Sequence, residues 1–284
     1  MNKKDFAIVF TVKNANPNGD PNNGNRPRTT YSGLGEITDV SLKRKIRNRL
    51  LDNGLSIFVQ SDSKTVDEFT SLKDRMANVE ELKKAVTKED YSKIACSKFF
   101  DIRAFGQVIS FKGEDADGKK TKGLSIGIRG PVSIQNAYSV SPVSITTNKI
   151  TKSVNLETKE DGGLSADRMG DKHSVDFGLY VAYGSINAYL AEDTNFTEED
   201  CNEIKKVLPS IFENDSSTAR PEGSMEVVNV YWWEHENKSG QYSSAKVHRS
   251  LKVKELSASP QSIEDYNITV EPLQNLKVEV LEGF

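Results

Sequence analysis

Side chains suited to binding a phosphate chain are concentrated between residues 16 and 51. From Pro21 to Leu51 there are seven lysines and arginines but only two acidic residues, whereas the chain of 284 residues has a formal charge of −3. Lysine and arginine supply charge for phosphates, and amide and hydroxyl groups supply hydrogen bonds for phosphates and riboses. A basic segment in an acidic protein indicates a defined polyanion site. The candidates in this segment are Asn16, Asn18, Arg26, Arg28, Thr38, Lys43, Arg44 and Arg47.

Part of the basic segment is predicted to be helical. Thr38 or Asp39 can cap the start of this helix, and the Asn-Gly pair at 53–54 can end it. Lys43 and Arg47 are four residues apart, so a helix places them side by side, where they suit two points on a sugar-phosphate chain. The helix N-terminus also favours an anion, although Asp39 partly opposes one. The alternative is a solvated basic face without a ligand.

A second group of candidates lies in the polar segment 146–173, which is rich in lysine, aspartate and glycine. A loop of that length inside a domain is uncommon and is usually functional. Lys149, Lys152 and Arg168 are the cations that could contact phosphates there. Met169 is apolar in a polar tip, so it could insert between bases, or pack on its own hairpin or on a neighbouring subunit.

A third group of candidates consists of two polar residues on either side of an apolar one. Arg103 and Gln107 flank Phe105; Phe105 is expected in the core, while the two polar side chains could reach a nucleic acid. Most aromatic residues lie in strand-like runs, and no strand carries an aromatic motif of the ribonucleoprotein type. That pattern counts against reading of base sequence and fits a protein that grips a nucleic-acid backbone.

The periodicity of apolar residues predicts the elements that position these candidates. Apolar runs and alternation predict strands at about 5–12, 124–134, 175–190 and 225–233, and helices at about 41–50, 66–98 and from Thr197 onward, with shorter strands at 251–253 and 276–281. Reduced to its core, the order is strand, helix, strand, strand, helix, strand. This α+β order is typical of ferredoxin-like and RNA-recognition folds.

The length of the chain and the placement of its polar segments indicate one elaborated domain. We expect a core at about 5–54, 124–145 and 174–235, large insertions at 55–123 and 146–173, and a C-terminal extension at 236–284.

Composition narrows the class of protein further. The apolar run at 6–10 is too short for a signal peptide or a membrane span, so a cytoplasmic protein with no membrane partner is expected. Because the two cysteines are far apart in the sequence, neither a disulfide framework nor a cysteine-rich zinc site is expected. Residues 115–118 resemble a calcium loop, but the later ligands are missing. The three histidines show no ligand spacing, so no metal or other cofactor is expected.

Several motifs together resemble the backbone subunit of type I CRISPR interference complexes, known as Cascade, with subtype I-C the most similar branch. The motifs are Asn14–Pro21, Gly35–Arg47, Arg103–Gln107, Ile128–Val132, Asp176–Tyr180 and Arg220–Val227. They extend over about residues 5–235. Singly each motif is weak, and their specificity lies in the combination.

The resemblance implies a hand-like protein on an RNA-recognition fold that stacks head to tail along a CRISPR RNA guide. Insertion 146–173 would then be the thumb-like hairpin that interrupts the guide at regular intervals, and insertion 55–123 the finger region. It also implies contacts with the target DNA strand, with other copies of the chain, and with the capping and large subunits of Cascade. No catalytic centre is implied.

Two other functions stay open at the level of sequence. One is a metal-dependent ribonuclease of the type III kind, for which Asp20 or Asp39 near the expected RNA path could serve. The other is a monomeric RNA-recognition module with base preference. A subunit that coats guides of varying sequence must hold phosphates and riboses and leave the base edges free, which favours the backbone-subunit interpretation.

Overall fold

The computed structural model describes the backbone of residues 1–114, 120–152 and 168–284, and the surroundings of side chains outside 111–124 and 152–168. The protein is a mixed α+β structure built on a large antiparallel sheet. In the described residues this sheet has eight strands, in the order β14-β11-β1-β10-β8-β4, and β7 and β9 also pair with β10.

The elements have the following bounds. The strands of the large sheet are β1 Lys4–Ala15, β4 Leu34–Ile37, β7 Val132–Ile134, β8 Ala137–Pro142, β9 Ile145–Lys152, β10 Arg168–Ile186, β11 Met225–Glu234 and β14 Val278–Glu282. The smaller pairs are β2 Gly19–Asp20 with β3 Arg26–Pro27, β5 Gly106–Glu114 with β6 Lys120–Arg129, and β12 Leu251–Glu255 with β13 Tyr266–Val270. The helices are α1 Asp39–Asp52, α2 Leu72–Ala77, α3 Lys88–Lys98, α4 Phe100–Phe105, α5 Ala188–Thr194, α6 Glu198–Val207 and α7 Ser244–His248.

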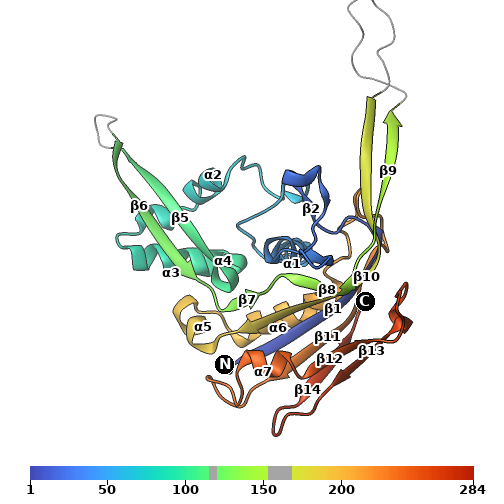
Figure 1. Cartoon of the computed structure of the whole chain (residues 1–284). Helices are drawn as coiled ribbons and strands as arrows, with labels where there is room; N and C mark the ends of the chain where they lie inside the picture. The colour runs from blue at the N-terminus through green and yellow to red at the C-terminus, as the bar shows by residue number, and fades with distance from the viewer. Residues whose placement is uncertain (115–119, 153–167) are drawn as a thin grey trace, which may run out of the picture.

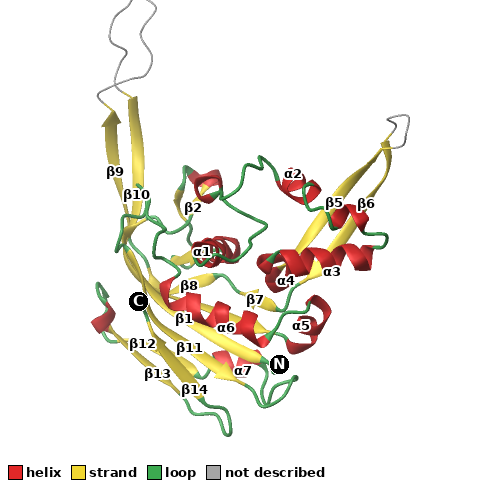
Figure 2. Ribbon diagram, turned by 180° about the vertical axis from the view of Figure 1, so that it is seen from behind, coloured by secondary structure: helices red, strands yellow, loops and turns green. Residues whose placement is uncertain are grey.

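Strand β1 is buried on both faces, as its continuous apolar run predicts. Phe6, Ile8 and Phe10 point to one side, into a core shared with α1 and α6. Ala7 and Val9 point to the other side, into a second core closed by α7, β12 and β13. The two views of the ribbon agree with this division, because α5 and α6 cover one face of the sheet and α7 with β12–β13 cover the other (Figure 2).

Two β-hairpins project from the same side of the molecule, at opposite ends, with α1 and β2 between them (Figure 1). One is β5–β6, which packs with α3 and α4 around a third apolar cluster. The other is formed by β9 and the first part of β10, which pair from Val175 opposite Ile145 out to Arg168 opposite Lys152. The described parts of the segment 146–173 lie in this second hairpin.

The structure confirms some local predictions and corrects others. Thr38 caps α1 by accepting a hydrogen bond from the Ser41 amide, and Thr197 forms a capping box with Asp200 at the start of α6. The continuous helix expected over 66–98 is wrong. It is divided into α2, a 3-10 turn at Leu82–Lys84 and α3, because α2 ends at Asn78 and a new capping box forms at Thr87.

The strand expected over 124–134 is also interrupted. It divides at Gly130 and Pro131 into β6 and β7, which belong to different sheets. The sequence reading missed β13, and the last strand starts at Val278 rather than 276. No helix in the described residues combines the length and the apolar content needed to cross a membrane.

Candidate nucleic-acid interface

Hydrogen bonds within the protein shape the asparagine-rich loop after β1. The side-chain oxygen of Asn18 accepts from the Thr38 amide at 2.9 Å and from its hydroxyl at 3.0 Å, which ties the loop to the start of α1. The Asn16 side-chain amide donates to the Asn25 carbonyl at 2.7 Å. The Asn16 backbone amide donates to the Ala219 carbonyl. Asn16, Asn18 and Thr38 therefore hold the loop in one shape.

Arg26 connects this loop to the hairpin β9–β10. Its guanidinium donates to the Thr147 hydroxyl at 3.0 Å and lies 3.5 Å from Nδ1 of His173. Thr147 and His173 are cross-strand partners in the hairpin, and their side chains lie 2.9 Å apart. The loop cations and the hairpin cations therefore belong to one continuous surface.

Arg28 is the second loop cation, and it lies beside an acid. Its guanidinium is 3.5 Å from the Asp20 carboxylate, and both side chains are partly exposed. In the described residues, Nε of Arg28 and the side-chain oxygen of Asn16 are buried without a hydrogen-bond partner. These two atoms are polar groups that the loop itself does not satisfy.

Each of the five bases of helix α1 has a partner within the protein, and two of these bases, Lys45 and Arg47, are largely buried. The pairs are Lys43 with Asp39 at 2.9 Å, Arg44 with the Val59 carbonyl at 2.6 Å, Lys45 with Asp215, Arg47 with Asp101 at 2.9 Å, and Arg49 with the Ser210 hydroxyl at 3.1 Å. Burial lowers the pKa of Lys45, and the Asp215 carboxylate partly offsets this. A helix that packs on a sheet uses much of its charge internally.

Asp101 is the centre of the contact between α1 and the first insertion. Its buried carboxylate accepts from Nε of Arg47 and from the backbone amides of Phe58 and Val59, at 2.7 to 3.0 Å. The Arg47 guanidinium also lies over the Phe105 ring, 4.9 Å from its centre. The structure thus uses Arg44 and Arg47 to anchor the insertion, so α1 does not present the free Lys43–Arg47 pair that the spacing suggested.

Arg103 likewise has an internal role. It forms a bidentate pair with Asp200 at 2.9 and 2.7 Å and lies over the Phe100 ring. That geometry joins α4 to the capping box of α6. A sequence reading could not find this partner, because 97 residues separate the two side chains.

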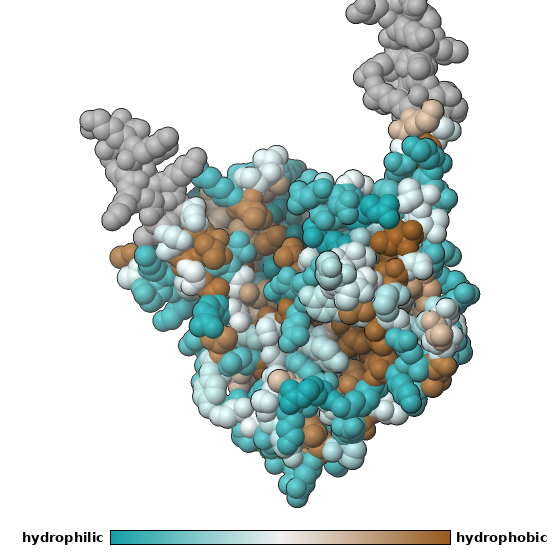
Figure 3. Space-filling view, in the orientation of Figure 1, coloured by the Kyte–Doolittle hydropathy of each residue, from teal (hydrophilic) through white to brown (hydrophobic). Residues whose placement is uncertain are grey.

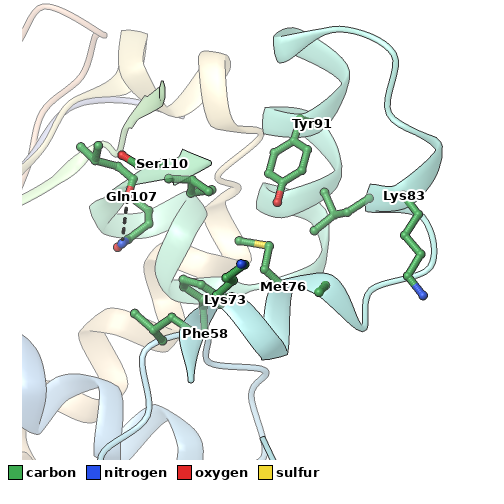
Figure 4. Close-up of a pocket in the computed structure, with 12 residues that line it drawn as sticks. Phe58, Lys73, Met76, Lys83, Tyr91, Gln107 and Ser110 are labelled. Carbon is green, nitrogen blue, oxygen red and sulfur yellow. Dashed lines mark hydrogen bonds between the residues drawn. The ribbon is translucent and has the colours of Figure 1, made fainter. Parts of the chain in front are cut away.

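Gln107 faces a different part of the molecule. It lines an apolar cavity of about 340 Å³ between β5, α2 and α3, together with Phe58 and Met76 (Figure 4). Its side-chain amide donates to the Val108 carbonyl at 3.3 Å. Gln107 therefore lies on the opposite hairpin from Arg26 and its partners.

The hairpin β9–β10 presents an exposed cation, Lys149. The Lys149 side chain is 76% exposed and lies 3.6 Å from Asp171, which is itself half-exposed. Met169 is 73% exposed. The backbones of Lys152 and Arg168 pair with each other at the outer end, but their side chains lie outside the described residues. Lys172, which the sequence reading passed over, lies on the same hairpin without an ion-pair partner among the described residues.

The loop also carries an aromatic residue that the sequence reading missed. Tyr31 is fully exposed, in the turn between β3 and β4. An exposed aromatic ring beside cations can stack on a base of any sequence. The signal was available in the sequence as a tyrosine placed among threonine, serine and glycine at 29–33, a composition typical of a turn.

Taken together, the geometry forms a surface rather than an enclosed site. Arg26, Arg28 and Lys149 lie along the loop and hairpin, on the side of the molecule where both hairpins project. In the described residues no group of three or more histidine, cysteine, aspartate or glutamate side chains is arranged to hold a metal ion. The arrangement can hold an extended anion by charge and hydrogen bonds.

Comparison with known proteins gives three findings. A family model described as CRISPR-associated protein Cas7 matches residues 2–271. A CRISPR-associated protein Cas7 of Haloferax volcanii is 25% identical over 291 residues, covering 99% of this chain and 83% of that protein. A chain of a pre-nicking CRISPR RNA-guided surveillance complex superposes with a TM-score of 0.48 at 16% identity, over 85% of this chain and 81% of that one. A chain of another such complex gives 0.44 at 15%, over 81% and 68%.

Proposed function

Because this chain belongs to the Cas7 family of CRISPR-associated proteins, we propose that it is a non-catalytic subunit that binds the CRISPR RNA guide in a type I surveillance complex, with subtype I-C the nearest branch. The observation that carries this proposal is the surface formed by the loop after β1 and the hairpin β9–β10, joined through Arg26. A protein that coats guides of any sequence needs such a surface, rich in charge and hydrogen-bond donors.

Arg26, Arg28, Lys149, Lys152 and Arg168 are the proposed phosphate contacts. Lys43 is a weaker member of the set, because Asp39 already pairs with it. Asn16, Asn18 and Thr38 position the loop. Arg44, Arg47 and Arg103 serve the guide indirectly, by holding the first insertion and α4 in place.

The proposal includes a ferredoxin-like core. In the four-strand pattern the chain order strand 1, 2, 3, 4 gives the sheet order 4-1-3-2, and β11-β1-β10-β8 follows that order here. The hairpin β9–β10 then corresponds to the thumb, with Met169 placed to insert between bases. The first insertion, including β5–β6, corresponds to the finger region.

The proposed partners follow from this role. Copies of the chain would stack head to tail along one guide, because a heterologous contact repeats along a filament. The guide bases would stay free for the target DNA strand, and the ends of the filament would meet the capping and large subunits of a cytoplasmic complex.

Purification from the native host tests the proposal. The complex should contain RNA with heterogeneous spacer sequence and a constant repeat-derived end. A preparation free of nucleic acid would refute the role. Incubation with complementary RNA and a divalent metal tests the ribonuclease alternative, because regularly spaced cuts in that RNA would show a catalytic subunit.

A further inference from the structure

A groove lies on the far side of the sheet from α1, at the margin of the second apolar core. It has a volume of about 660 Å³ and lies between β12 on one side and β8 and β10 on the other. Val140, Val181 and Tyr183 form its apolar floor, and Leu251 and Val253 form the wall at β12. The space-filling view shows apolar side chains gathered at the surface in this region (Figure 3).

Strand β12 borders this groove with an open edge. In the described residues β12 pairs only with β13, and β13 contributes no residue to the groove. The Leu256 amide donates to the Asp265 carbonyl, and the Glu271 amide donates to the Ser250 carbonyl, both at 2.8 Å. These bonds fix which residues face β13.

In an antiparallel ladder the hydrogen-bonded pairs alternate with pairs whose backbone groups point outward. Ser250 and Leu256 are bonded to β13, so Lys252 and Lys254 share that direction. Leu251, Val253 and Glu255 therefore direct their amides and carbonyls to the other edge. These outward groups form the hydrogen-bonding edge of an incomplete sheet, beside an apolar floor.

We infer that this groove binds an extended peptide segment of a partner polypeptide, which adds a third strand to β12. Added strands gain main-chain hydrogen bonds from the open edge and specificity from alternate side chains on the floor. The open stretch Leu251–Glu255 is about 17 Å long, enough for a peptide of about five residues. The chemistry suits apolar residues alternating with polar ones.

The charged residues around the groove indicate which charge the bound peptide should carry. Lys254 is exposed and has no acidic partner among the described residues, so an acidic side chain opposite it would be favourable. Two copies of β12 placed edge to edge would oppose lysine to lysine, which disfavours self-pairing. Three carboxylates, those of Glu36, Glu255 and Glu271, lie near the groove lining, which disfavours a nucleic acid.

A labelled synthetic peptide tests the inference on the full-length chain. The probe is an acetylated and amidated hexapeptide with the order threonine, valine, glutamate, valine, threonine, valine, measured by fluorescence anisotropy. A peptide of equal composition with its three valines consecutive should bind more weakly. Replacement of the glutamate by lysine should weaken binding by up to about fivefold, the range of a cross-strand charge pair.

Val253→Pro is the decisive variant. It removes an outward amide without removing a bond to β13, and proline is tolerated where the missing donor faces outward. Loss of one hydrogen bond should weaken binding of the probe by about 2- to 12-fold. Val280→Pro is the matched control, because β14 is also an edge strand and its Val280 amide also points outward, as the bond from Gly283 to Val228 shows.

Hydrogen exchange supplies a second readout that does not depend on the variants folding. The probe should slow exchange at the amides of Leu251 and Val253 and leave that of Lys252 unchanged. The inference fails if no peptide binds at millimolar concentration, if the Val253→Pro and Val280→Pro proteins bind alike, or if a short oligothymidine protects these amides and the peptide does not.

Discussion

Helix α1 and the hairpin β9–β10 both carry basic residues but use them in opposite ways. In α1 every lysine and arginine has a partner within the protein, and two of these bases, Lys45 and Arg47, are largely buried. In the hairpin, Lys149 is mostly exposed, and Asp171, its acidic partner among the described residues, is itself half-exposed. A sequence shows how much charge a segment contains, but packing decides how much of it a ligand can reach.

The difference has a simple physical origin. One face of α1 must cover the sheet, so its long side chains pass close to carboxylates such as the buried Asp101 and the partly buried Asp215. A charge that leaves water needs such a partner. On the hairpin, the Lys149 side chain lies in solvent, where it is available for exchange with the counterions of a polyanion.

The largest expected effect comes from breaking an internal pair of α1. Arg47→Met should destabilise the protein by about 3 to 5 kcal/mol, because it leaves the Asp101 carboxylate buried without its cation. Urea unfolding measures this change as a lower midpoint with an unchanged slope.

Lys43→Met is the matched control, since Lys43 belongs to the same helix and its pair with Asp39 is more exposed. It should change stability by less than about 1 kcal/mol. Equal effects of the two substitutions would erase the distinction between buried and accessible bases in α1.

The next effect concerns the hairpin. Lys149→Ala combined with Lys152→Ala should lower the slope of log affinity against log salt by about 1.4, which is about 0.7 for each single-strand phosphate contact. Stability should stay within about 0.5 kcal/mol. Filter binding over a range of salt concentrations, with two guides of unrelated sequence, measures both the slope and its independence from sequence.

The control for the hairpin is Lys206→Ala, a similarly exposed lysine on α6 with an acidic neighbour at 3.8 Å. It should leave the salt slope unchanged. A hairpin variant that loses affinity for one guide only would show base recognition instead of backbone binding.

Several local features were predictable because neighbouring residues determine them. Thr38 and Thr197 indicate the starts of two helices, because each can cap one. The apolar run of β1 indicates a strand that is buried on both faces. The internal partners of the bases were not predictable, since Arg47 and Asp101 are 54 residues apart and Arg103 and Asp200 are 97 apart. Only the tertiary structure brings these charges together.

The motifs show a similar limit. Arg103–Gln107 and Ile128–Val132 read as two separate signals, but they form one structural joint. Gly106 has a φ of 78°, and a Cβ there would collide with the Ile128 carbonyl, while Gly130 meets the backbone of Ala104 and Gly106 in the same way. The two glycines allow the start of β5 to lie beside the end of β6, so the two motifs together encode a close backbone contact.

The interior of the protein and the hairpin β9–β10 should also differ in how they affect the dependence of stability on pH. Burial lowers the pKa of His248, although Asp5 and the Gly184 carbonyl partly oppose this. Burial would raise the pKa of Asp5, but hydrogen bonds from His235 and Ser244 and the charges of Lys3 and His248 lower it overall. Both groups lie in the interior, where β1 meets the C-terminal extension.

The directions of these two pKa shifts predict that the protein loses stability in two stages as the pH falls. Below the unfolded value of 6.5 the unfolded chain binds a proton that folded His248 resists, so stability should fall as pH drops from about 7 to 5. Asp5 adds a second loss below its unfolded value of 3.8. His248→Gln should flatten the first stage in urea unfolding at several pH values, whereas His173→Gln on the hairpin should not. Equal profiles for both variants would contradict this assignment.

The smallest effect belongs to Lys43, a base of α1 that is neither buried nor fully exposed. Its ammonium is partly exposed, but Asp39 lies 2.9 Å away and competes with any phosphate. Lys43→Ala should therefore lower the salt slope by less than about 0.7, the value for one full contact. Asp39→Asn should have the opposite effect, because it frees the ammonium and removes an acid from the helix N-terminus. A rise in guide affinity with Asp39→Asn, alongside a small loss with Lys43→Ala, would show that an internal pair limits how much of the charge of α1 reaches the ligand.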